Sequence, residues 1–460
     1  MRQEETISAI ATPPGSGGIG IVRLSGETAL RVAAAVFRPK RERALSDMGT
    51  YEAAYGQIVA PNGEIVDEAI ALVMRSPHSY TMEDVVELQC HGGGLVLQRV
   101  LALTLAAGAR LAQPGEFTKR AFLNGRLDLA EAGAVMDIVS AKSGAALRAA
   151  SGRLAGRFSG RIRDWRQSLL ALIAHLEAAI DFPEDDIEAP ALAEAKQRLS
   201  ALTEDMNRLL QTAETGRVLR EGLLAAIIGR PNVGKSSLLN ALLREERAIV
   251  TDIPGTTRDS IEEVASVGGI PLRVVDTAGI RDTADVVERI GVERARQAAA
   301  QAALVLALFD GSRPLSPEDE AIGEIAREKD SILLITKSDL PAVLDEEALR
   351  QKLPGSDILR LSTKTGEGME NLSRRIADRV YGGERPGDES LFLANVREAD
   401  LLRQAIDSLA AAREAIESGM SEDFIVIDLR AAWEKLGEIV GETVGEDIID
   451  EIFRRFCLGK

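Results

Sequence analysis

The segment from Gly229 to Ser236 could bind the phosphates of a nucleotide. It reads Gly-Arg-Pro-Asn-Val-Gly-Lys-Ser, which fits the pattern G-x-x-x-x-G-K-S. Glycines at these positions let backbone N–H groups curl around a β-phosphate at the start of a helix. We predict that Lys235 reaches the β- and γ-phosphates and that the Ser236 hydroxyl binds Mg²⁺. The apolar run 224–228 precedes the loop and a helical stretch, 237–242, follows it, so the motif has the strand-loop-helix context that it needs.

Two further elements follow where a GTPase would hold its metal ion and γ-phosphate. Asp276-Thr277-Ala278-Gly279 comes directly after the apolar run 272–275. Asp276 would lie just outside the Mg²⁺ ligand set, and the Gly279 N–H would face the γ-phosphate. Thr256-Thr257-Arg258-Asp259 precedes this element, and there a switch loop would supply a metal-bound hydroxyl.

A third element selects the base. Thr336-Lys337-Ser338-Asp339 ends the apolar run 332–335. The Asp339 carboxylate can accept hydrogen bonds from N1–H and the 2-amino group of guanine, and adenine offers neither donor. The sequence therefore predicts GTP rather than ATP, with 362–364 touching the base edge by backbone. GTPases usually carry Asn where Thr336 stands, so we expect guanine specificity to survive through Asp339 with somewhat weaker binding.

The residues predicted to contact GTP form four groups along the chain. They are Asn232, Val233, Gly234, Lys235, Ser236 and Ser237; Thr251, Asp252, Ile253, Pro254, Gly255, Thr256 and Thr257; Asp276, Thr277, Ala278 and Gly279; and Thr336, Lys337, Asp339, Ser362, Thr363 and Lys364.

Hydrolysis needs a group that orients the attacking water. Small GTPases often place a glutamine after the Asp-x-x-Gly element, but this chain has Ile280 there. Another side chain must position the water, and another cation must offset the charge of the transition state. Glu288 is a candidate, and a solvated helical glutamate is the alternative.

Composition limits the function classes. A chain of 460 residues with 45% hydrophobic residues can bury several cores, and about three domains are expected. The 55 basic and 72 acidic residues give a net charge of −17, so a local patch or a partner would have to supply contact to nucleic acid. Cys90 and Cys457 are the only cysteines, which excludes a disulfide framework. We see no secretory signal and no membrane-length apolar run, so we expect a soluble cytoplasmic protein.

Periodicity predicts a multidomain α/β plus all-α chain. Residues 1–118 are predicted to form a mixed α/β domain, with a hairpin that turns at Asn62-Gly63. Residues 216–382 alternate buried strands with helices, which indicates a mostly parallel sheet. Because helical patterns occupy both 119–215 and 383–460, we predict one helical domain interrupted by an inserted P-loop domain. Two independent helical domains are the alternative.

Two other patterns are set aside. Gly15–Gly20 fits G-x-G-x-x-G, but residues 21–24 read as a strand where a dinucleotide site needs a helix. Cys90-His91 has no further ligands at metal spacing, so we predict that Cys90 is a small buried hydrophobe.

Over essentially its full length, the chain resembles the bacterial tRNA-modification GTPases of the MnmE (TrmE) family. The resemblance rests on Ala-Thr-Pro-Pro-Gly at 11–15, Gln-Pro-Gly-Glu-Phe at 113–117, the GTPase elements and a terminal Cys-x-Gly-Lys. It implies an N-terminal domain that dimerises and binds a tetrahydrofolate one-carbon donor, either 5,10-methylenetetrahydrofolate or 5-formyltetrahydrofolate. It also implies potassium-dependent GTP hydrolysis that is coupled to dimerisation of the G domains.

By the same resemblance, the chain works in a heterotetramer with the flavoprotein MnmG, which carries FAD. Together they build the 5-carboxymethylaminomethyl (or aminomethyl) group on the wobble uridine, position 34, of certain tRNAs, and the partner makes much of the tRNA contact. The rival interpretation is a ribosome-assembly GTPase, which shares Thr-Thr-Arg-Asp and Asp-Thr-Ala-Gly. Such proteins usually add an RNA-binding module, and we recognise none after residue 381.

The resemblance also implies site residues. Asn232 and the backbone carbonyls of Thr251, Ile253 and Thr256 look like K⁺ ligands, Thr257 joins Ser236 on Mg²⁺, and Glu288 orients the attacking water. The folate positions are Arg23, Glu87, Arg126 and Lys460, with an Arg at 126 where relatives can carry Lys. Cys457 is a candidate nucleophile, and a structural role for its thiol is equally open. We expect the apolar stripe at 448–453 to dock the tail and Gly459 to act as a hinge.

Overall fold

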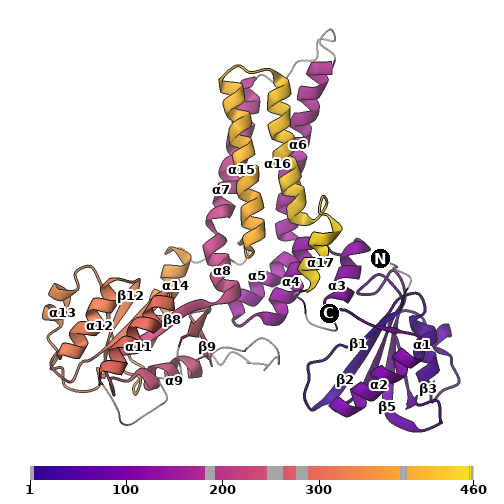
Figure 1. The fold of residues 1–460 in the computed structure, drawn as a ribbon, viewed down its shortest axis with the longest axis horizontal. Helices are drawn as coiled ribbons and strands as arrows, with labels where there is room; N and C mark the ends of the chain where they lie inside the picture. Colours follow the sequence, from indigo (N-terminus) through magenta and orange to yellow (C-terminus); the bar gives the residue numbers. More distant parts are fainter. Residues whose placement is uncertain are drawn as a thin grey trace. The chain divides into compact units, whose positions relative to one another are not determined.

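The structure is a computed structural model, and it describes residues 5–181, 192–245, 263–275, 288–383, 387, 391–454, 456 and 459. The chain divides into two compact units, Met1–Met136 with Gly437–Lys460, and Asp137–Leu436 (Figure 1). Each unit is considered by itself. Among the described residues, no helix is both long and apolar enough to cross a lipid bilayer.

The first unit is built on a seven-stranded sheet in the order β3-β4-β5-β6-β2-β1-β7. Neighbouring strands are antiparallel except β1 and β7, which are parallel. The strands are β1 (Ile7–Ile10), β2 (Gly17–Ser25), β3 (Phe37–Pro39), β4 (Glu52–Val59), β5 (Ile65–Met74), β6 (Val85–Gly92) and β7 (Arg110–Leu111). The predicted hairpin is confirmed, because β4 and β5 pair across the Asn-Gly turn. The strand predicted at 21–24 is also confirmed, because β2 runs from Gly17 to Ser25 where a dinucleotide site needs a helix.

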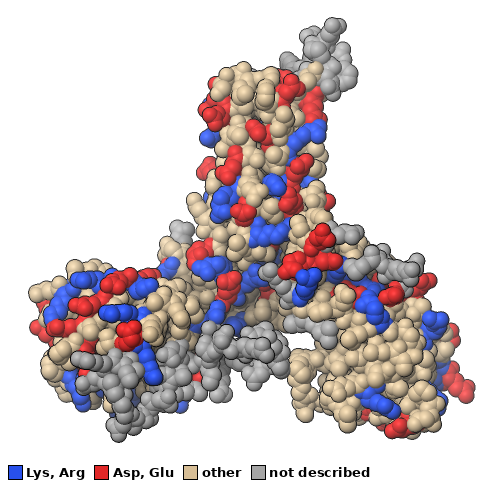
Figure 2. All heavy atoms as spheres, viewed as in Figure 1, with Lys and Arg blue, Asp and Glu red and all other residues tan. Residues whose placement is uncertain are grey.

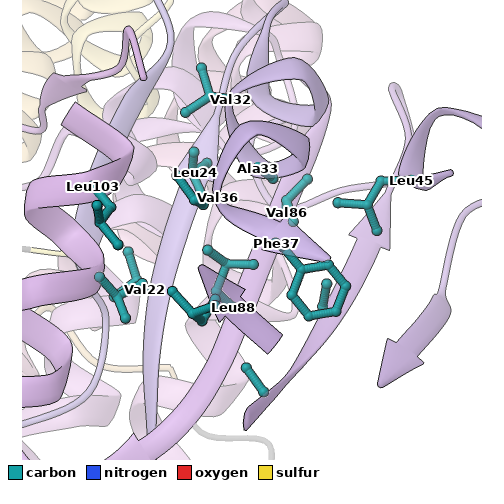
Figure 3. Close-up of a cluster of buried hydrophobic side chains, with 14 of the residues drawn as sticks. Val22, Leu24, Val32, Ala33, Val36, Phe37, Leu45, Val86, Leu88 and Leu103 are labelled. Carbon is teal, nitrogen blue, oxygen red and sulfur yellow. The ribbon is translucent and has the colours of Figure 1, made fainter. Parts of the chain in front are cut away.

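One face of this sheet is covered by α1 (Ala29–Val36) and α2 (Gly94–Ala106). Side chains alternate across a strand, so Val22 and Leu24 of β2 point into the same core as Val86 and Leu88 of β6 (Figure 3). Cys90 lies in this core at 3% exposure, as predicted. The intervening residues of β2 and β6 therefore face the opposite side of the sheet.

The rest of the first unit joins segments from both ends of the chain. It contains α3 (Glu116–Leu123), the start of α4 (Leu129–Ser140), the end of α16 (Glu422–Val440) and α17 (Glu446–Arg454). Leu129, Ile449, Phe453 and Phe456 form one apolar cluster. The Lys119 ammonium also pairs with Asp450 across 331 residues of sequence. The C-terminal segment is thus part of the folded N-terminal unit.

The second unit contains a helical bundle built from both sides of the predicted insertion. Its helices are α5 (Gly144–Leu154), α6 (Arg157–Asp181), α7 (Leu192–Gln211) and α8 (Ala213–Glu221), and then α15 (Val396–Glu417) and α16. Lys196 of α7 pairs with Glu417 of α15 at 2.8 Å, and the Arg166 guanidinium of α6 lies 4.1 Å from the Trp433 ring centre on α16. Because these helices pack together, one interrupted helical domain is confirmed and two independent domains are excluded.

The inserted domain is a six-stranded sheet in the order β13-β12-β11-β8-β10-β9. Only the pairing of β9 with β10 is antiparallel, so the predicted mostly parallel sheet is confirmed. The strands are β8 (Leu223–Gly229), β9 (Glu263–Val267), β10 (Ile270–Val274), β11 (Leu304–Asp310), β12 (Ser331–Thr336) and β13 (Asp357–Arg360). The antiparallel edge strand β9 was not foreseen from the sequence.

Helices cover both faces of this sheet, which is why its central strands are apolar throughout. Alternate residues of β8 show the arrangement: Ala225 and Ile227 pack in one core, and Ala226 and Ile228 pack in the other. The first core includes α9 (Lys235–Glu245) and α14 (Met369–Tyr381). The second includes α11 (Glu288–Gln301), α12 (Pro317–Arg327) and α13 (Glu346–Lys352).

Candidate functional site

The phosphate loop joins the end of β8 to the start of α9, as the sequence predicts. Its backbone needs conformations that side chains rarely adopt, with φ of +60° at Asn232 and +110° at Gly234. A Cβ at Gly229 would lie 2.9 Å from the Leu308 carbonyl oxygen of β11, so only glycine fits there. The helix begins at Lys235, which places its first backbone N–H groups at the loop, where they favour an anion.

The Lys235 ammonium lies inside this loop. It donates to the carbonyl oxygens of Gly229 at 2.8 Å and Arg230 at 2.9 Å. Burial lowers the pKa of Lys235 below its ordinary value. A phosphate at the loop would compensate this half-buried cation, so the geometry suits the role predicted for this residue. Ser236 and Ser237 follow in the first turn of the helix.

The residues predicted to recognise the base meet at the ends of β12 and β13. The Ser362 hydroxyl donates to the Asp339 carboxylate at 2.7 Å, and the backbone N–H of Ser338 donates to the Leu361 carbonyl at 3.2 Å. The hydrogen bond from Ser362 lowers the pKa of Asp339, which keeps this exposed carboxylate ionised. Because parallel strands end at one edge of a sheet, the loops after β8, β12 and β13 lie at the same edge.

Thr336 is the last residue of β12 and is buried. It is 3% exposed, and its hydroxyl donates to the Val233 carbonyl of the phosphate loop at 2.8 Å. The Phe309 carbonyl is a second acceptor, at 3.1 Å. The departure from the usual Asn therefore leaves a side chain that holds the phosphate loop.

Several predicted GTPase residues lie outside the described residues. They are Thr251, Asp252, Ile253, Pro254, Gly255, Thr256, Thr257, Asp276, Thr277, Ala278 and Gly279. Glu288 begins α11, and its side chain is not described. The roles given to these residues stay predictions.

A second group of predicted residues comes together in the first unit. Arg23 of β2 and Glu87 of β6 are paired in register on the sheet face opposite α1 and α2. The Arg23 Nε donates to Glu87 Oε1 at 2.9 Å. Arg126 follows α3 in the chain and joins them through an aromatic ring, because its guanidinium carbon lies 4.7 Å from the ring centre of Tyr80.

Tyr80 is the residue that the sequence reasoning missed. Its ring also lies 5.9 Å from the Arg23 guanidinium, so two cations share one aromatic side chain. Its hydroxyl is 2.9 Å from the Thr118 hydroxyl, and burial raises the pKa of Tyr80. A single tyrosine between β5 and β6 matches no sequence motif. It is identified as a site residue only by its contacts with Arg23 and Arg126 in the structure.

The tail returns to the start of the chain. The Phe456 ring packs at a tilt against Phe453, with ring centres 5.0 Å apart. Ile449 lies in the same apolar cluster, which confirms that the apolar stripe of α17 docks the tail. Gly459 has φ +88°, and a Cβ there would lie 2.3 Å from the Ile10 carbonyl oxygen. Close packing therefore requires glycine at this position, and the hinge predicted at Gly459 stays a prediction. Cys457 and Lys460 lie outside the described residues.

Gly115 explains one of the sequence motifs. It lies in Gln-Pro-Gly-Glu-Phe with φ +69°, and a Cβ on it would meet the Phe453 carbonyl oxygen at 2.5 Å and the Phe456 Cβ at 2.8 Å. The next residues, Glu116 and Phe117, begin α3, and the Phe117 ring lies 5.6 Å from the Arg23 guanidinium. The motif therefore touches both the C-terminal segment and the Arg23 cluster.

Family models match two parts of the chain. Residues 129–457 match the family described as "MnmE helical domain", and residues 6–126 match "GTP-binding protein TrmE N-terminus". Among solved structures, the chain is similar to the G domain of the T. maritima FeoB iron transporter at 28% identity, covering 34% of this chain and 97% of that one with a TM-score of 0.25.

Whole proteins match over their full length. The chain is 51% identical to the tRNA modification GTPase MnmE of Symbiobacterium thermophilum, covering 99% of this chain and 100% of the relative. It is 49% identical to the protein of the same name from Geobacillus thermodenitrificans, covering 100% of both. With half of the residues identical from end to end, and with the helical and N-terminal family models both matched, the chain belongs to the MnmE family of tRNA modification GTPases.

Proposed function

We propose that this chain is a potassium-dependent GTPase that acts with the flavoprotein MnmG on tRNA. The reaction is formation of the 5-carboxymethylaminomethyl (or aminomethyl) group on wobble uridine 34, with a tetrahydrofolate as one-carbon donor. The observation that carries the proposal is the convergence of Arg23, Glu87 and Arg126 around Tyr80, in a chain that also holds a complete phosphate loop. A ribosome-assembly role is disfavoured by the family.

The nucleotide would be bound by residues that lie after the carboxyl ends of strands in the inserted domain. Lys235 would hold the β- and γ-phosphates, and its half-buried ammonium fits an anionic ligand. Ser236 and Thr257 would bind Mg²⁺. Asp339 would read guanine, and its low pKa supports the ionised state that accepts two hydrogen bonds.

Potassium would replace an arginine finger. We propose the Asn232 side chain as its ligand, with the backbone carbonyls of Thr251, Ile253 and Thr256. Asn232 is exposed beside the phosphate loop and is held there by its left-handed backbone. A monovalent cation at this position would offset charge that develops between the β- and γ-phosphates. Glu288 would orient the attacking water.

The Arg23 cluster suits a folate. A pterin needs a partner for its edge of donors and acceptors, and the Glu87 carboxylate can accept from it. The glutamate tail of a folate needs cations, and Arg126, beside the Tyr80 ring, can supply one. Arg23 would lie at the pterin end, because it is paired with Glu87. We propose 5,10-methylenetetrahydrofolate or 5-formyltetrahydrofolate as the ligand. Lys460 would complete the site, which Gly459 supports by bringing the end of the chain to Ile10, one strand from Arg23.

The open sheet face supports a homodimer of the first unit. Tyr55 and Ile70 are partners on β4 and β5 and point away from the core, at 49% and 42% exposure. Apolar side chains exposed next to each other are common at protein interfaces. A dimer formed through this unit would also hold two inserted G domains in one assembly, as G-domain dimerisation during hydrolysis requires.

The partner would make much of the contact with tRNA. On the described part of the face drawn in Figure 2, basic and acidic side chains are interspersed along the helical bundle, and neither sign forms a continuous surface. A net charge of −17 also disfavours tRNA binding by this chain alone. We propose a heterotetramer with MnmG, which would carry FAD, in the cytoplasm.

Two experiments test the proposal. In a strain that lacks its own MnmE, the wild-type chain should restore the modified wobble uridine, and Glu87→Ala should not, although its GTP hydrolysis stays normal. Glu27→Ala, an exposed glutamate of the same unit, is the matched control and should restore the modification. Full modification with Glu87→Ala would count against the folate site. GTP hydrolysis should be much faster in K⁺ than in Na⁺, and equal rates would remove the potassium site.

A further inference from the structure

Asp310 lies between the two loops that would hold the nucleotide. It ends β11, the strand between β8, which leads to the phosphate loop, and β12, which leads to the base-recognition loop. In register, Leu308 of β11 faces Gly229 and Asp310 faces Thr336. Asp310 is 3% exposed. An ionisable side chain at such a depth requires partners.

Both carboxylate oxygens of Asp310 have partners from the surrounding loops. Oδ1 accepts from the backbone N–H and the hydroxyl of Ser312, at 3.0 and 2.6 Å. Oδ2 accepts from the Lys337 ammonium at 2.7 Å. Burial opposes ionisation, but the hydrogen bonds from Lys337 and Ser312 outweigh it and lower the pKa of Asp310. The carboxylate therefore fixes the lysine of the base-recognition loop, whose backbone is strained at φ +61°.

The phosphate loop is tied to the same carboxylate. Arg230, the second residue of that loop, has its Nη2 3.5 Å from Asp310 Oδ2 and its Nε 3.5 Å from Asp319 Oδ1. Among the described residues, neither Arg230 Nε nor Asp319 Oδ1 has a hydrogen bond, although both atoms are buried. Asp319 is itself fixed, because its other oxygen accepts from Ser316 at the start of α12. The ion pairs offset the burial of the Arg230 guanidinium.

A second connection between the loops runs through Thr336. Its hydroxyl donates to the Val233 carbonyl, four residues after Gly229 in the phosphate loop. Residues 336 and 337 are thus joined to the phosphate loop twice, once by this hydroxyl and once by the chain Lys337–Asp310–Arg230. The connection through Asp310 is charged, and it occurs next to Thr336, where GTPases usually carry the longer Asn side chain.

We propose that Asp310 is a positioning residue for the nucleotide: by holding Lys337 and Arg230 together, it fixes the separation between the phosphate loop and the base-recognition loop. A guanine nucleotide must touch both loops at once, so a fixed separation lowers the entropy lost on binding. The part of the nucleotide that spans the loops is the same in GDP and GTP. The proposal rests on the GTPase activity of the family and does not depend on folate, potassium or tRNA.

The test is nucleotide affinity in the full-length protein. For Asp310→Asn, we expect the dissociation constants of fluorescent GDP and of a non-hydrolysable GTP analogue to rise together by roughly tenfold, the loss of about one charge-assisted hydrogen bond. We expect kcat at saturating GTP to stay within about twofold, because Asp310 acts on nucleotide binding. We expect the preference for guanine over adenine to persist through Asp339. A merely structural role would not give this split between affinity and kcat.

Matched variants make the result decisive. Asp330→Asn removes an exposed carboxylate of the same domain, paired with Arg379 on the surface, and should leave both affinities unchanged. Arg230→Met removes the phosphate-loop end of the chain Lys337–Asp310–Arg230 and should reproduce the loss of nucleotide affinity. If Asp310→Asn does not fold, this variant alone tests the proposal. Affinities for both nucleotides equal to those of Asp330→Asn, in whichever of the two variants folds, would overturn the proposal.

A double-mutant cycle separates the two connections. Thr336→Val keeps the shape of the side chain and removes the hydroxyl that reaches Val233. If both connections fix the same separation, the combined loss in Asp310→Asn/Thr336→Val will differ from the sum of the single losses, since residues of one network are non-additive. Strict additivity would show that Asp310 does not share this function with Thr336, and would overturn the proposal that Asp310 fixes the separation of the two loops.

Discussion

Gly459 lies so close to Ile10 that a Cβ on the glycine would come within 2.3 Å of the isoleucine carbonyl oxygen. Gly459 belongs to the segment 437–460, and Ile10 ends the first strand of the sheet. Segments far apart in the sequence therefore meet in one folded unit. This contact makes the position of the tail a testable property of the N-terminal unit.

Gly115→Ala should loosen the C-terminal segment. The alanine would force its Cβ against the Phe453 carbonyl and Phe456, in addition to the strain of a left-handed backbone. Gly125→Ala is the matched control, since Gly125 has a similar φ of +77° and nothing within 4 Å of its Cβ position. We expect Gly115→Ala to lower the local stability of α17 by about 1–3 kcal/mol more than the control does. Hydrogen exchange of the α17 amides measures the difference, and equal exchange in the two variants would refute the close contact.

Tyr80→Ala should weaken tetrahydrofolate binding if the Arg23 cluster is the folate site. The ring lies beside two guanidinium groups, so its loss leaves both cations without their common neighbour. We expect the dissociation constant, measured by calorimetry, to rise about tenfold or more. Tyr80→Phe loses only the contact with the Thr118 hydroxyl and should bind within about threefold of wild type. Tyr381→Ala, in the other unit, controls for general effects. Unchanged binding by Tyr80→Ala would remove the ring from the site.

Glu398→Gln should destabilise the helical domain. Glu398 of α15 accepts from Arg153 of α5 at 2.6 Å, and both side chains are 5% exposed, so the pair joins the segments before and after the inserted domain. Removing one partner of a buried ion pair costs about 3–5 kcal/mol. Glu177→Gln breaks a partly exposed pair with Arg430 and should cost less than about 1 kcal/mol. Hydrogen exchange in α5 and α15 compares them, and similar exchange rates in both variants would contradict the prediction.

Alkaline pH should destabilise the first unit through Cys90. Burial, assisted by Asp67, raises the pKa of Cys90 from 9.0 to about 12. Above pH 9 the unfolded thiol loses its proton while the folded thiol keeps it, so the unfolded state is favoured as pH rises. At pH 10 this amounts to about 1.4 kcal/mol. Urea unfolding of wild type and Cys90→Ala, followed by circular dichroism at pH 7 and pH 10, isolates the effect. Equal pH dependence in the two proteins would exclude it.

The sequence by itself determined the features that depend on neighbouring residues. Phosphate binding uses consecutive backbone N–H groups, so Gly229–Ser236 predict the loop and the helix that follows. Asp339 predicts a guanine site because its carboxylate follows the end of a buried strand. The Asn-Gly turn between two apolar runs likewise predicts the β4–β5 hairpin. Continuous apolar runs that alternate with helical stretches predict the parallel sheet.

The tertiary structure decided what distant segments do together. Arg23, Tyr80 and Arg126 have no fixed spacing, and their cluster exists because strand pairing and α3 bring them to one face of the sheet. Strand order places Asp310 between two loops that the sequence separates by about a hundred residues. The same holds for Gly459, whose need to be glycine comes from a strand at the other end of the chain. Such contacts depend on the packing of complete elements, and no local pattern of residue types encodes that packing.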